Sequence, residues 1–407
     1  MKTLTFPNAS ALLVALCCVT EGFAAVDRSF RPGTGLGGGN ETSGNVVVPL
    51  ADGKILLGGD FSTYNGISRP DLVRLNPDGS LDESLHLLGG VNGPDEPAIR
   101  SASLQPDGKI IVSGNFTTIS GIAGSLARLH PNGTLDTAWV PELNRLGGGL
   151  IWSIVLPDGR ILAWGFRAIE RLNADGSADT SFNAAVDGRF FGLRAVSLQA
   201  DGRILLAGTV FVENRPVGQQ LTRLHANGSL DTSFAPPQFP GSLGLNGARE
   251  MPDGRILVFG SFDTVDGRAR PGLALLHSDG RLDTSARFRG KGSYVRAWPL
   301  SDGSIVATRA AHFPNVEVTV LTEPPMRQRF KGRPWKIEFA VSLNGYVTDI
   351  AEDARGRLLI AGEFYALNGV RVPTGIARFL RRGRPLPFPR PETSVHRQRV
   401  PASASQR

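Results

Sequence analysis

Aspartate is the most conspicuous polar residue of this 407-residue chain, and carboxylate oxygens are ligands that calcium prefers. The run from Asn76 to Asp82 (NPDGSLD) has the outline of a calcium loop. An EF-hand loop, however, needs the spacing D-x-[DN]-x-[DN]-G and a distal glutamate, which this run lacks. Asp, Asn and Gly also favour tight turns, because Asx side chains bond the nearby backbone and Gly readily adopts positive φ. We therefore expect turns here and no metal site.

Histidine offers no clearer catalytic pattern. His130, His225 and His277 occupy one position of a repeated motif at which other copies carry Asn76 and Asn173. A position that accepts either residue type is expected to be a turn or surface position. The chain also lacks the H-E-x-x-H, G-x-S-x-G and P-loop motifs in a suitable context. These observations predict no catalytic residue and no cofactor.

A set of arginines recurs on a predicted strand, just before a second tight turn. They are Arg74, Arg128, Arg171, Arg223 and Arg378. A guanidinium group carries several N–H donors, so we expect these side chains to bond turn carbonyls or a nearby aspartate of the same or the next repeat. The alternative is a ring of anion-binding sites.

The stretch from Ser101 to Trp139 shows which elements position these residues. Asp107 and Gly108 form a hairpin turn before KIIVSGNF, whose β-branched and aromatic residues predict a strand over residues 109–116. A loop leads to a third strand at Leu126 to Leu129, and a second turn leads to a short last strand at Leu135 to Trp139. The unit is therefore expected to contain four antiparallel strands.

This unit repeats along the chain. The hairpin aspartate and glycine recur at Asp52 and Gly53, Asp107 and Gly108, Asp158 and Gly159, Asp201 and Gly202, Asp253 and Gly254, and Asp302 and Gly303, with a degraded copy at Arg355 and Gly356. Successive glycines lie 43 to 55 residues apart. Seven units of this length predict an all-β fold, a seven-bladed β-propeller over residues 25–380. A β-helix is the alternative, but its coils are usually shorter and do not need two hairpins each.

The two ends of the repeat region are offset by one strand. Asp27 to Phe30 (DRSF) is a closing element without a hairpin before it, and the last unit runs through Ile376 to Phe379 without a closing element after it. An open solenoid would more naturally cap both ends with atypical repeats. We therefore predict that Asp27 to Phe30 pairs as the outermost strand of the seventh blade and closes the ring.

The terminal segments differ from the repeats. Lys2, an apolar run over residues 11–19 and small residues before position 25 predict a secretory signal peptide over residues 1–24. Cys17 and Cys18 would be removed with it, and lipidation of Cys18 is the weaker alternative. Residues 381–407 hold seven arginines, five prolines and one glutamate. This composition predicts a disordered basic tail, whose functional alternative is weak contact with an anionic surface.

The combination QPDGKIIVSGNF with ARLHPNGTLDTAW resembles the delta-60 repeat, a family of bacterial exported proteins. The resemblance covers roughly residues 26 to 380 and implies a β-propeller in an exported protein, either secreted or in the periplasm or cell envelope. It implies no catalytic residues, because the family is largely without an assigned biochemical function. The sixth unit departs from the pattern, since its third-strand and closing motifs are eroded and Arg327 to Phe330 is at best a worn closing element.

The alternating strands predict two different faces. The Asp-Gly turns share one face, here called the hairpin face. The opposite face, here called the loop face, carries the second-to-third-strand loops at residues 62–71, 212–220, 263–272 and 365–374 and the crossovers at residues 87–99 and 236–247. Uniform turns suit a scaffold, whereas loops that differ can carry function.

The sequence favours a non-enzymatic, monomeric binding scaffold that recognises a protein or polysaccharide partner through the loop face, with no specific nucleic-acid partner. One alternative is a propeller-type glycan lyase or hydrolase that uses acids such as Asp95, Glu96 or Glu213. An enzyme needs a converging, asymmetric set of titratable groups, and the repeats are symmetric instead. The other alternative is a lectin-like protein with equivalent sites, which would keep several loops alike.

Overall fold

The structure, a computed structural model, describes residues 25–38, 42–94, 96–146, 149–165, 168–183, 193–208, 211–212, 215–216, 221–239, 244–288, 292–310, 315–324, 334–368 and 370–380. All regular secondary structure in these ranges is β-strand, which confirms the all-β prediction. None of the described residues belongs to a helix long and apolar enough to cross a membrane. The predicted signal peptide, both cysteines and the basic tail lie outside the described residues.

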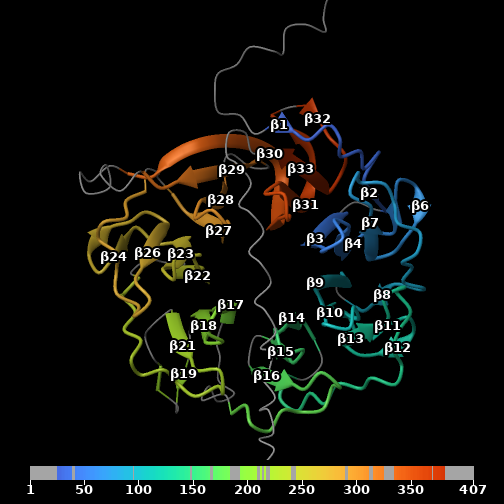
Figure 1. The fold of residues 1–407 in the computed structure, drawn as a ribbon, viewed down its shortest axis with the longest axis horizontal. Coiled ribbons are helices and arrows are strands. Elements are labelled where there is room, and N and C mark those ends of the chain that lie inside the picture. Colours follow the sequence, from blue (N-terminus) through green and yellow to red (C-terminus); the bar gives the residue numbers. More distant parts are fainter. Residues whose placement is uncertain are drawn as a thin grey trace, which may run out of the picture.

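The first five repeats each form a three-stranded antiparallel sheet. These sheets are β3(Ser43–Pro49)-β4(Ile55–Asp60)-β7(Leu72–Leu75), β9(Ala98–Leu104)-β10(Ile110–Asn115)-β13(Leu126–Leu129), β14(Trp152–Val155)-β15(Ile161–Trp164)-β16(Ile169–Leu172), β17(Leu193–Leu198)-β18(Ile204–Gly208)-β21(Leu221–Leu224) and β22(Gly244–Glu250)-β23(Ile256–Ser261)-β26(Leu273–Leu276). Figure 1 shows them arranged around a common axis, with the first strand of each sheet nearest the centre. This is the arrangement of a β-propeller.

The hydrophobic core lies between neighbouring sheets. One cluster joins Leu56 and Leu72 of the first sheet to Ile110 and Val112 of the second, and all four side chains are almost fully buried. Because each sheet is covered on both faces by its neighbours, its strands are apolar at successive positions and do not alternate. This explains strand sequences as apolar as KILLGG and KIIVSG.

The Asp-Gly hairpins have nearly identical geometry. The glycines at positions 53, 108, 159, 202, 254 and 303 adopt φ between 82° and 85°, a range that side chains disfavour. In the second repeat, the Lys109 backbone N–H donates to Asp107 Oδ1 at 3.1 Å. Aspartate therefore fixes the turn through its side chain, while glycine allows the positive φ.

The predicted fourth strand is shorter in the structure than in the sequence analysis. In the first five repeats it shrinks to isolated bridges, at Leu75 with Leu81, Leu129 with Leu135, Leu172 with Ala178, Leu224 with Leu230, and Leu276 with Leu282. The chain then turns, because Asp231 Oδ1, for example, accepts the Ser233 N–H at 3.0 Å and the Asp231 carbonyl accepts the Phe234 N–H at 3.3 Å. The closing aspartate ends the strand that it follows.

The last two repeats are joined in one sheet, which contains the only fully formed outer strand among the described residues. The sheet has the order β1(Ala25–Val26)-β33(Ile376–Leu380)-β31(Leu358–Leu367)-β30(Lys336–Glu352)-β29(Asn315–Thr322)-β28(Ile305–Ala310)-β27(Tyr294–Pro299). The first half of β30 pairs with β29 and its second half pairs with β31. The register shifts between Leu343 and Gly345, and Gly345 adopts a φ of 111°. The worn closing element at residues 327–330 lies outside the described residues.

Several loop-face connections form a common hairpin, which the sequence analysis did not anticipate. The hairpins are β5(Thr63–Tyr64)-β6(Ile67–Ser68), β11(Thr118–Ile119)-β12(Ile122–Ala123), β24(Thr264–Val265)-β25(Arg268–Ala269) and β31-β32(Val370–Arg371). Their tips contain non-glycine residues with positive φ, namely Asn65, Ser120, Asp266 and Asn368. Residues of the preceding crossovers, β2(Leu36–Gly37) and β8(Val91–Asn92), pair with the first two hairpins. The pair β19(Phe211–Val212)-β20(Arg215–Pro216) belongs to the fourth repeat. These loops therefore differ in their side chains but share a backbone conformation.

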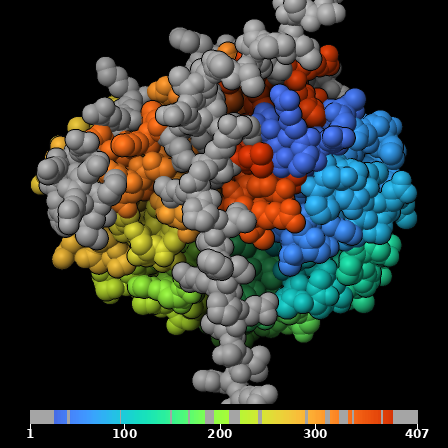
Figure 2. All heavy atoms as spheres, turned by 45° about the horizontal axis from the view of Figure 1, so that its top comes forward, coloured from blue at the N-terminus to red at the C-terminus, as the bar shows by residue number. Residues whose placement is uncertain are grey.

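The N-terminal segment lies beside the last strand, but the prediction that Asp27 to Phe30 forms the outer strand is wrong. Ala25 pairs with Leu380 and Val26 with Phe379, whereas residues 27–30 form a turn. The Phe30 N–H closes this turn by donating to the Asp27 carbonyl at 3.0 Å. Figure 2 shows the N-terminal residues (blue) packed against the C-terminal strands (red). Phe30 is buried in a cluster with Leu75 and Ile376.

The first prediction concerns this junction. Phe30→Ala should destabilise the protein by about 3–5 kcal/mol, because it empties a site shared by the first and last repeats. In hydrogen-exchange measurements, β31 and β33 should lose protection before β10 does. Arg28→Ala is the matched control, since Arg28 lies in the same turn but is exposed. Equal protection of β31 and β33 in the variant and the parent protein would contradict the closure.

Candidate binding face and inner ring

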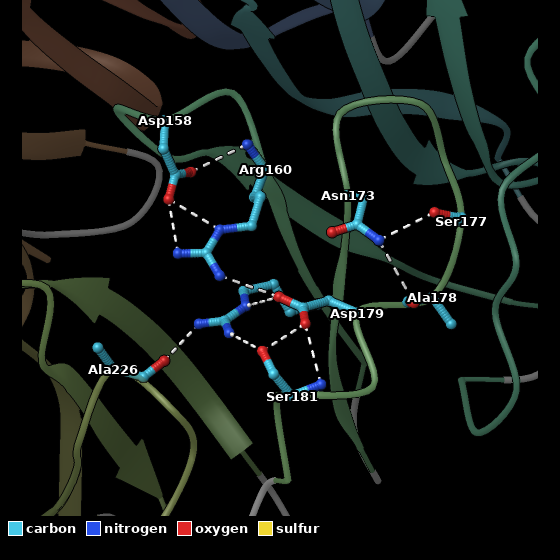
Figure 3. A network of polar contacts seen from close by, with 9 residues as sticks. Asp158, Arg160, Asn173, Ser177, Ala178, Asp179, Ser181 and Ala226 are labelled. Atoms are coloured by element: carbon cyan, nitrogen blue, oxygen red, sulfur yellow. Dashed lines mark hydrogen bonds and ion pairs between the residues drawn. The ribbon is translucent and has the colours of Figure 1, made fainter.

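The closing aspartates lie at the centre of a repeated polar network, shown for the third repeat in Figure 3. Asp179 Oδ2 accepts hydrogen bonds from Arg171 Nε at 2.7 Å and from the Arg160 guanidinium at 3.0 Å. Asp179 Oδ1 accepts the Ser181 hydroxyl at 2.6 Å. The aspartate thus holds two cations from two other strands of its own repeat.

The recurring arginine then joins its repeat to the next one. Arg74 donates to the Pro131 carbonyl at 2.9 Å and Arg128 donates to the Ala174 carbonyl at 3.0 Å, in each case in the second turn of the following repeat. Arg171 donates in the same way to the Ala226 carbonyl. These contacts are the structural role expected for the arginines, and they leave the alternative of a ring of anion sites without support.

An aromatic ring completes most of these junctions, whereas Leu85 stands at that position in the first repeat. The guanidinium carbon lies over the ring of the closing aromatic residue at 5.4 Å for Arg128 and Trp139, and at 4.3 Å for Arg223 and Phe234. Cations attract the face of an aromatic ring at these distances. We call this set of closing aspartate, arginine and aromatic residue the latch.

The same latch closes the ring with residues from opposite ends of the chain. Arg378 Nε donates to Asp27 Oδ2 at 2.8 Å, and the Arg378 guanidinium lies 4.6 Å from the centre of the Phe30 ring. Arg378 also donates to the Pro77 carbonyl of the first repeat. Asp27 and Phe30 therefore occupy in the last repeat the places that closing residues occupy elsewhere, although they come from the N-terminus.

The sequence analysis overlooked a second cation beside the closing aspartate, which comes from the residue after the Asp-Gly turn. Lys54 lies 2.8 Å from Asp82, Arg160 lies 3.0 Å from Asp179 and Arg255 lies 3.3 Å from Asp283. The signal was present, because a lysine or arginine directly follows the Asp-Gly turn in most copies. In the fifth repeat, Leu275 replaces the strand arginine, and Arg255 is the cation that remains on Asp283.

The latch shifts the acidity of its aspartate. Burial alone would raise the pKa of Asp231, but hydrogen bonds from Ser233 and Arg223 outweigh it and lower the pKa to about 2. The pKa of Asp82 is lowered for the same reason, by hydrogen bonds from Lys54, Ser84 and Arg74 that outweigh its burial. The carboxylates thus stay ionised over the whole physiological range.

On the loop side, the inner strands carry a repeated irregularity. The ring of inner strands consists of β3, β9, β14, β17, β22, β27 and the second half of β30, and most of them contain one unpaired bulge residue near the start of the strand. These residues are Asn45, Arg100, Arg194, Asn246, Val295 and Thr348. A β-bulge redirects a side chain out of the regular pleat, and bulges are frequent next to binding sites.

Neighbouring bulge residues contact each other around the ring. Arg100 donates to Asn45 Oδ1 at 3.2 Å, and Arg194 donates to Asn246 Oδ1 at 3.1 Å. Asn246 Nδ2 in turn donates to the Tyr294 carbonyl at 3.1 Å. The bulges therefore collect polar side chains from different repeats at the loop-side end of the inner strands.

Further along the inner strands, charged residues from distant repeats interact. Burial raises the pKa of Asp349, against hydrogen bonds from the backbone and the charges of Arg249 and Arg296. Asp349 accepts the Val47 N–H at 3.0 Å and Trp298 Nε1–H at 3.3 Å. Desolvation lowers the pKa of Arg296, and the positive charge of Arg100 lowers it further. We call Arg100, Arg249, Arg296 and Asp349 the axial cluster.

The structure describes one of the three acids considered for an enzyme. Asp95 and Glu213 lie outside the described residues. Glu96 is exposed, with a φ of 45°. Burial raises the pKa of the half-buried Asp60, against the charge of Arg100, and the charge of Glu96 raises it further. Among the described residues, no group of three or more His, Cys, Asp and Glu side chains is arranged to hold a metal ion.

One buried acid at the loop face was not anticipated. Asp71 is 7% exposed, and burial raises its pKa to about 7 although Asp71 Oδ2 accepts the Val91 N–H at 2.8 Å. Asp71 also has a φ of 61°. It follows a proline at the end of a loop, a position at which sequence alone would suggest a turn residue.

A second prediction follows from the latch. Because the folded-state pKa of Asp231 lies below its unfolded value, its contribution to stability is present above about pH 4 and is lost as the pH falls through about 2. Asp231→Asn should therefore destabilise the protein near neutral pH by about 1–3 kcal/mol, and the deficit should shrink towards pH 2. Denaturant unfolding at several pH values measures the difference. A deficit independent of pH would show that the charge plays no part.

The pKa of Asp71 is shifted in the opposite direction to that of Asp231, which gives a third prediction. Its folded-state pKa is raised to about 7, so ionisation reduces stability as the pH rises from about 4 through 7. Asp71→Asn keeps an acceptor for Val91 and tolerates positive φ, so the variant should be more stable than the parent above pH 7 by at most about 4 kcal/mol. The two proteins should have equal stability below pH 4. A variant that is less stable at pH 8 would contradict this account.

Comparisons with known proteins agree with the repeat architecture. Residues 50–85, 105–138, 156–182, 199–234 and 252–285 match a family described as a domain of unknown function (DUF5122) beta-propeller. No curated protein matches the chain in sequence.

Similar solved structures share little sequence with this chain. They include the extracellular domain of the one-component system protein BT4673 from B. thetaiotaomicron (9% identity, TM-score 0.49, 86% of this chain and 40% of that chain). Others are the WD40 beta propeller domain of Doa1 (12% identity, TM-score 0.48, 85% of this chain and 95% of that chain) and the gluconolactonase XC5397 from Xanthomonas campestris (14% identity, TM-score 0.37, 86% and 97%). The first of these proteins is thus matched over less than half of its own length. The repeat matches and the ring of sheets identify the chain as a β-propeller repeat protein.

Proposed function

We propose that this chain is an exported, non-enzymatic, seven-bladed β-propeller that binds a polymeric partner, protein or polysaccharide, through its loop face. The observation that carries the proposal is a difference between the two faces in how their polar and exposed side chains are used. Polar residues repeated at the hairpin side are engaged in latches within the molecule, as in Arg171 and Asp179. The loop face instead presents hairpins that share a backbone but differ in exposed side chains.

The exposed positions of these hairpins show what a partner would meet. Ile67 and Ile122 occupy equivalent positions and are 44% and 48% exposed, while Arg268 stands at the same position in the fifth repeat. The preceding strand anchors each hairpin through a buried side chain, such as Tyr64 or Ile119. A rigid anchor with interchangeable exposed residues is suited to recognition, since little conformational entropy is lost on binding.

The shared backbone of the hairpins favours one second candidate, a lectin-like protein with several equivalent sugar sites. The sequence analysis argued against it because the loops differed. That argument was mistaken for the first, second and fifth repeats, in which the hairpin tips are alike. The delta-60 family, the secretory signal and the monomeric state remain part of the proposal.

Glycan and polysaccharide arrays probed with the purified protein give the fourth prediction. Binding should be detected, and the double variant Ile67→Ser/Ile122→Ser should weaken it by about tenfold through loss of apolar contact area. Val140→Ser is the control, because Val140 is 70% exposed but follows a closing element at the hairpin side.

Unchanged binding by the double variant, with loss in the control, would place the partner on the wrong face for this proposal. Conversion of a bound glycan to product would replace the scaffold proposal with an enzyme. Absence of any glycan binding would remove the lectin-like candidate and leave a protein as the partner.

A further inference from the structure

The arginines of the inner ring differ from those of the latches because their side chains form no ion pair with a carboxylate among the described residues, although Asp60 attracts Arg100. Among the described residues, the guanidinium groups of Arg100 and Arg194 each bond only the neutral amide of an asparagine. Within the described residues, the side chains of Arg249 and Arg296 form no hydrogen bond or ion pair, and the Arg249 guanidinium lies over the Trp298 ring, at 5.9 Å. Every latch arginine, by contrast, holds an aspartate within 2.9 Å, as Arg171 does at 2.7 Å.

The charges of the inner strands are distributed unevenly along their length. Glu250 and Glu352 stand at the hairpin-side ends, where they accept the Ala200 N–H at 2.6 Å and the Ser301 N–H at 2.7 Å. Arg100, Arg194 and Arg296 stand at or next to the bulges, at the loop-side ends. The ring is therefore more positive toward the loop face.

Asp349 does not neutralise this excess. Its carboxylate oxygens already accept backbone N–H groups of Val47 and Ile350, each at 3.0 Å. It forms no ion pair with Arg249 or Arg296 within the described residues, although it attracts both. A single carboxylate thus faces two guanidinium groups, and Arg100 adds a third positive charge. Positive charges held near one another repel and favour binding of a counter-ion.

Asn45 provides independent evidence that a hydrogen-bond acceptor is missing at this place. The residue is 8% exposed, and its Oδ1 accepts from Arg100, but its buried Nδ2 has no hydrogen-bond partner among the described residues. Buried polar groups are nearly always paired, so an orphaned donor calls for an explanation. Next to the Arg100 guanidinium, it forms a set of donors without an acceptor, which an oxyanion would satisfy.

We propose that the loop-side end of the inner ring binds an oxyanion, the carboxylate of an acidic saccharide or a phosphate group, through Arg100, Arg296 and Asn45. Planar guanidinium groups bind carboxylate and phosphate through paired N–H donors. The inference rests on the proposed function, because it adds the chemistry of the partner recognised at the loop face. It assigns to the axial cluster the task of holding the anionic group while the loop hairpins contact the rest of the ligand.

Isothermal titration calorimetry of the purified protein tests the proposal with three probes: trigalacturonate, inorganic phosphate and neutral maltotriose. At least one of the two anions should bind, and maltotriose should not compete with it. Arg296→Gln should weaken anion binding by about tenfold or more, as expected for loss of a charge-assisted contact. Asp349→Asn should strengthen it several-fold, since it removes the carboxylate that repels the anion.

Arg281→Gln is the matched control for net charge. Its side chain is 77% exposed and pairs only loosely with Asp279, at 3.7 Å, on a turn at the hairpin side. Anion affinity of this variant should equal that of the parent. Thermal melts of all variants establish that each is folded.

The anion that binds identifies the source of the group: trigalacturonate alone indicates an acidic saccharide, and phosphate alone indicates a phosphorylated ligand. Binding of neither anion, or equal weakening by Arg281→Gln and Arg296→Gln, would overturn the proposal. The proposed function is tested separately: Ile67→Ser/Ile122→Ser leaves the axial cluster intact, so it should weaken array binding by about tenfold without changing phosphate affinity.

Discussion

A carboxylate shared by two cations at the junction between repeats is the interaction on which the rest of the structure depends. In each latch, one oxygen of the closing aspartate binds the strand arginine, and the same arginine reaches a turn carbonyl of the following repeat, as Arg128 reaches the Ala174 carbonyl. A buried ion pair contributes little net free energy, because desolvation offsets the attraction. The apolar clusters between sheets supply most of the stability, and the latch fixes how neighbouring sheets meet.

Closure follows from the same geometry. Arg378 needs an aspartate and an aromatic ring, and the chain supplies them from Asp27 and Phe30 at its other end. Without that segment, Arg378 would be a buried cation without a carboxylate, and the edge of β33 would be unpaired. Both are strongly unfavourable, so the N-terminal turn is held by charge, by packing and by the strand pairing of Ala25 and Val26. The closed arrangement in turn brings residues as distant in sequence as Val47 and Asp349 into contact.

Local sequence predicted those parts of the structure that local chemistry determines. The Asp-Gly turns, the apolar strands and the missing closing element were all readable, because turn residues and β-branched runs have few other uses. The fourth strand was overestimated, since the aspartate of Leu135 to Trp139 ends the strand instead of continuing it. The continuous strand β30 could not be foreseen, because a crossover and two half-strands look alike in sequence.

The candidate site was much less predictable than the fold. Bulges such as that at Arg100 depend on how two strands pair, and no residue type marks them in advance. The axial cluster forms only when the inner strands of several repeats assemble around the common axis, so Arg249, Arg296 and Asp349 carry no shared motif. The common loop hairpins had a readable signal in their Asn-Gly, Ser-Gly and Asp-Gly tips, which the differences in flanking side chains obscured.

The central claim is that the latch between the two ends of the chain is equivalent to the latches within it. A double-mutant cycle with Asp27→Asn and Arg378→Gln measures the coupling free energy of the closing pair, and the cycle with Asp231→Asn and Arg223→Gln provides the internal reference. The account predicts coupling of about 1–3 kcal/mol in both cycles, with similar values. Additive effects of Asp27→Asn and Arg378→Gln, together with clear coupling between Asp231 and Arg223, would contradict it.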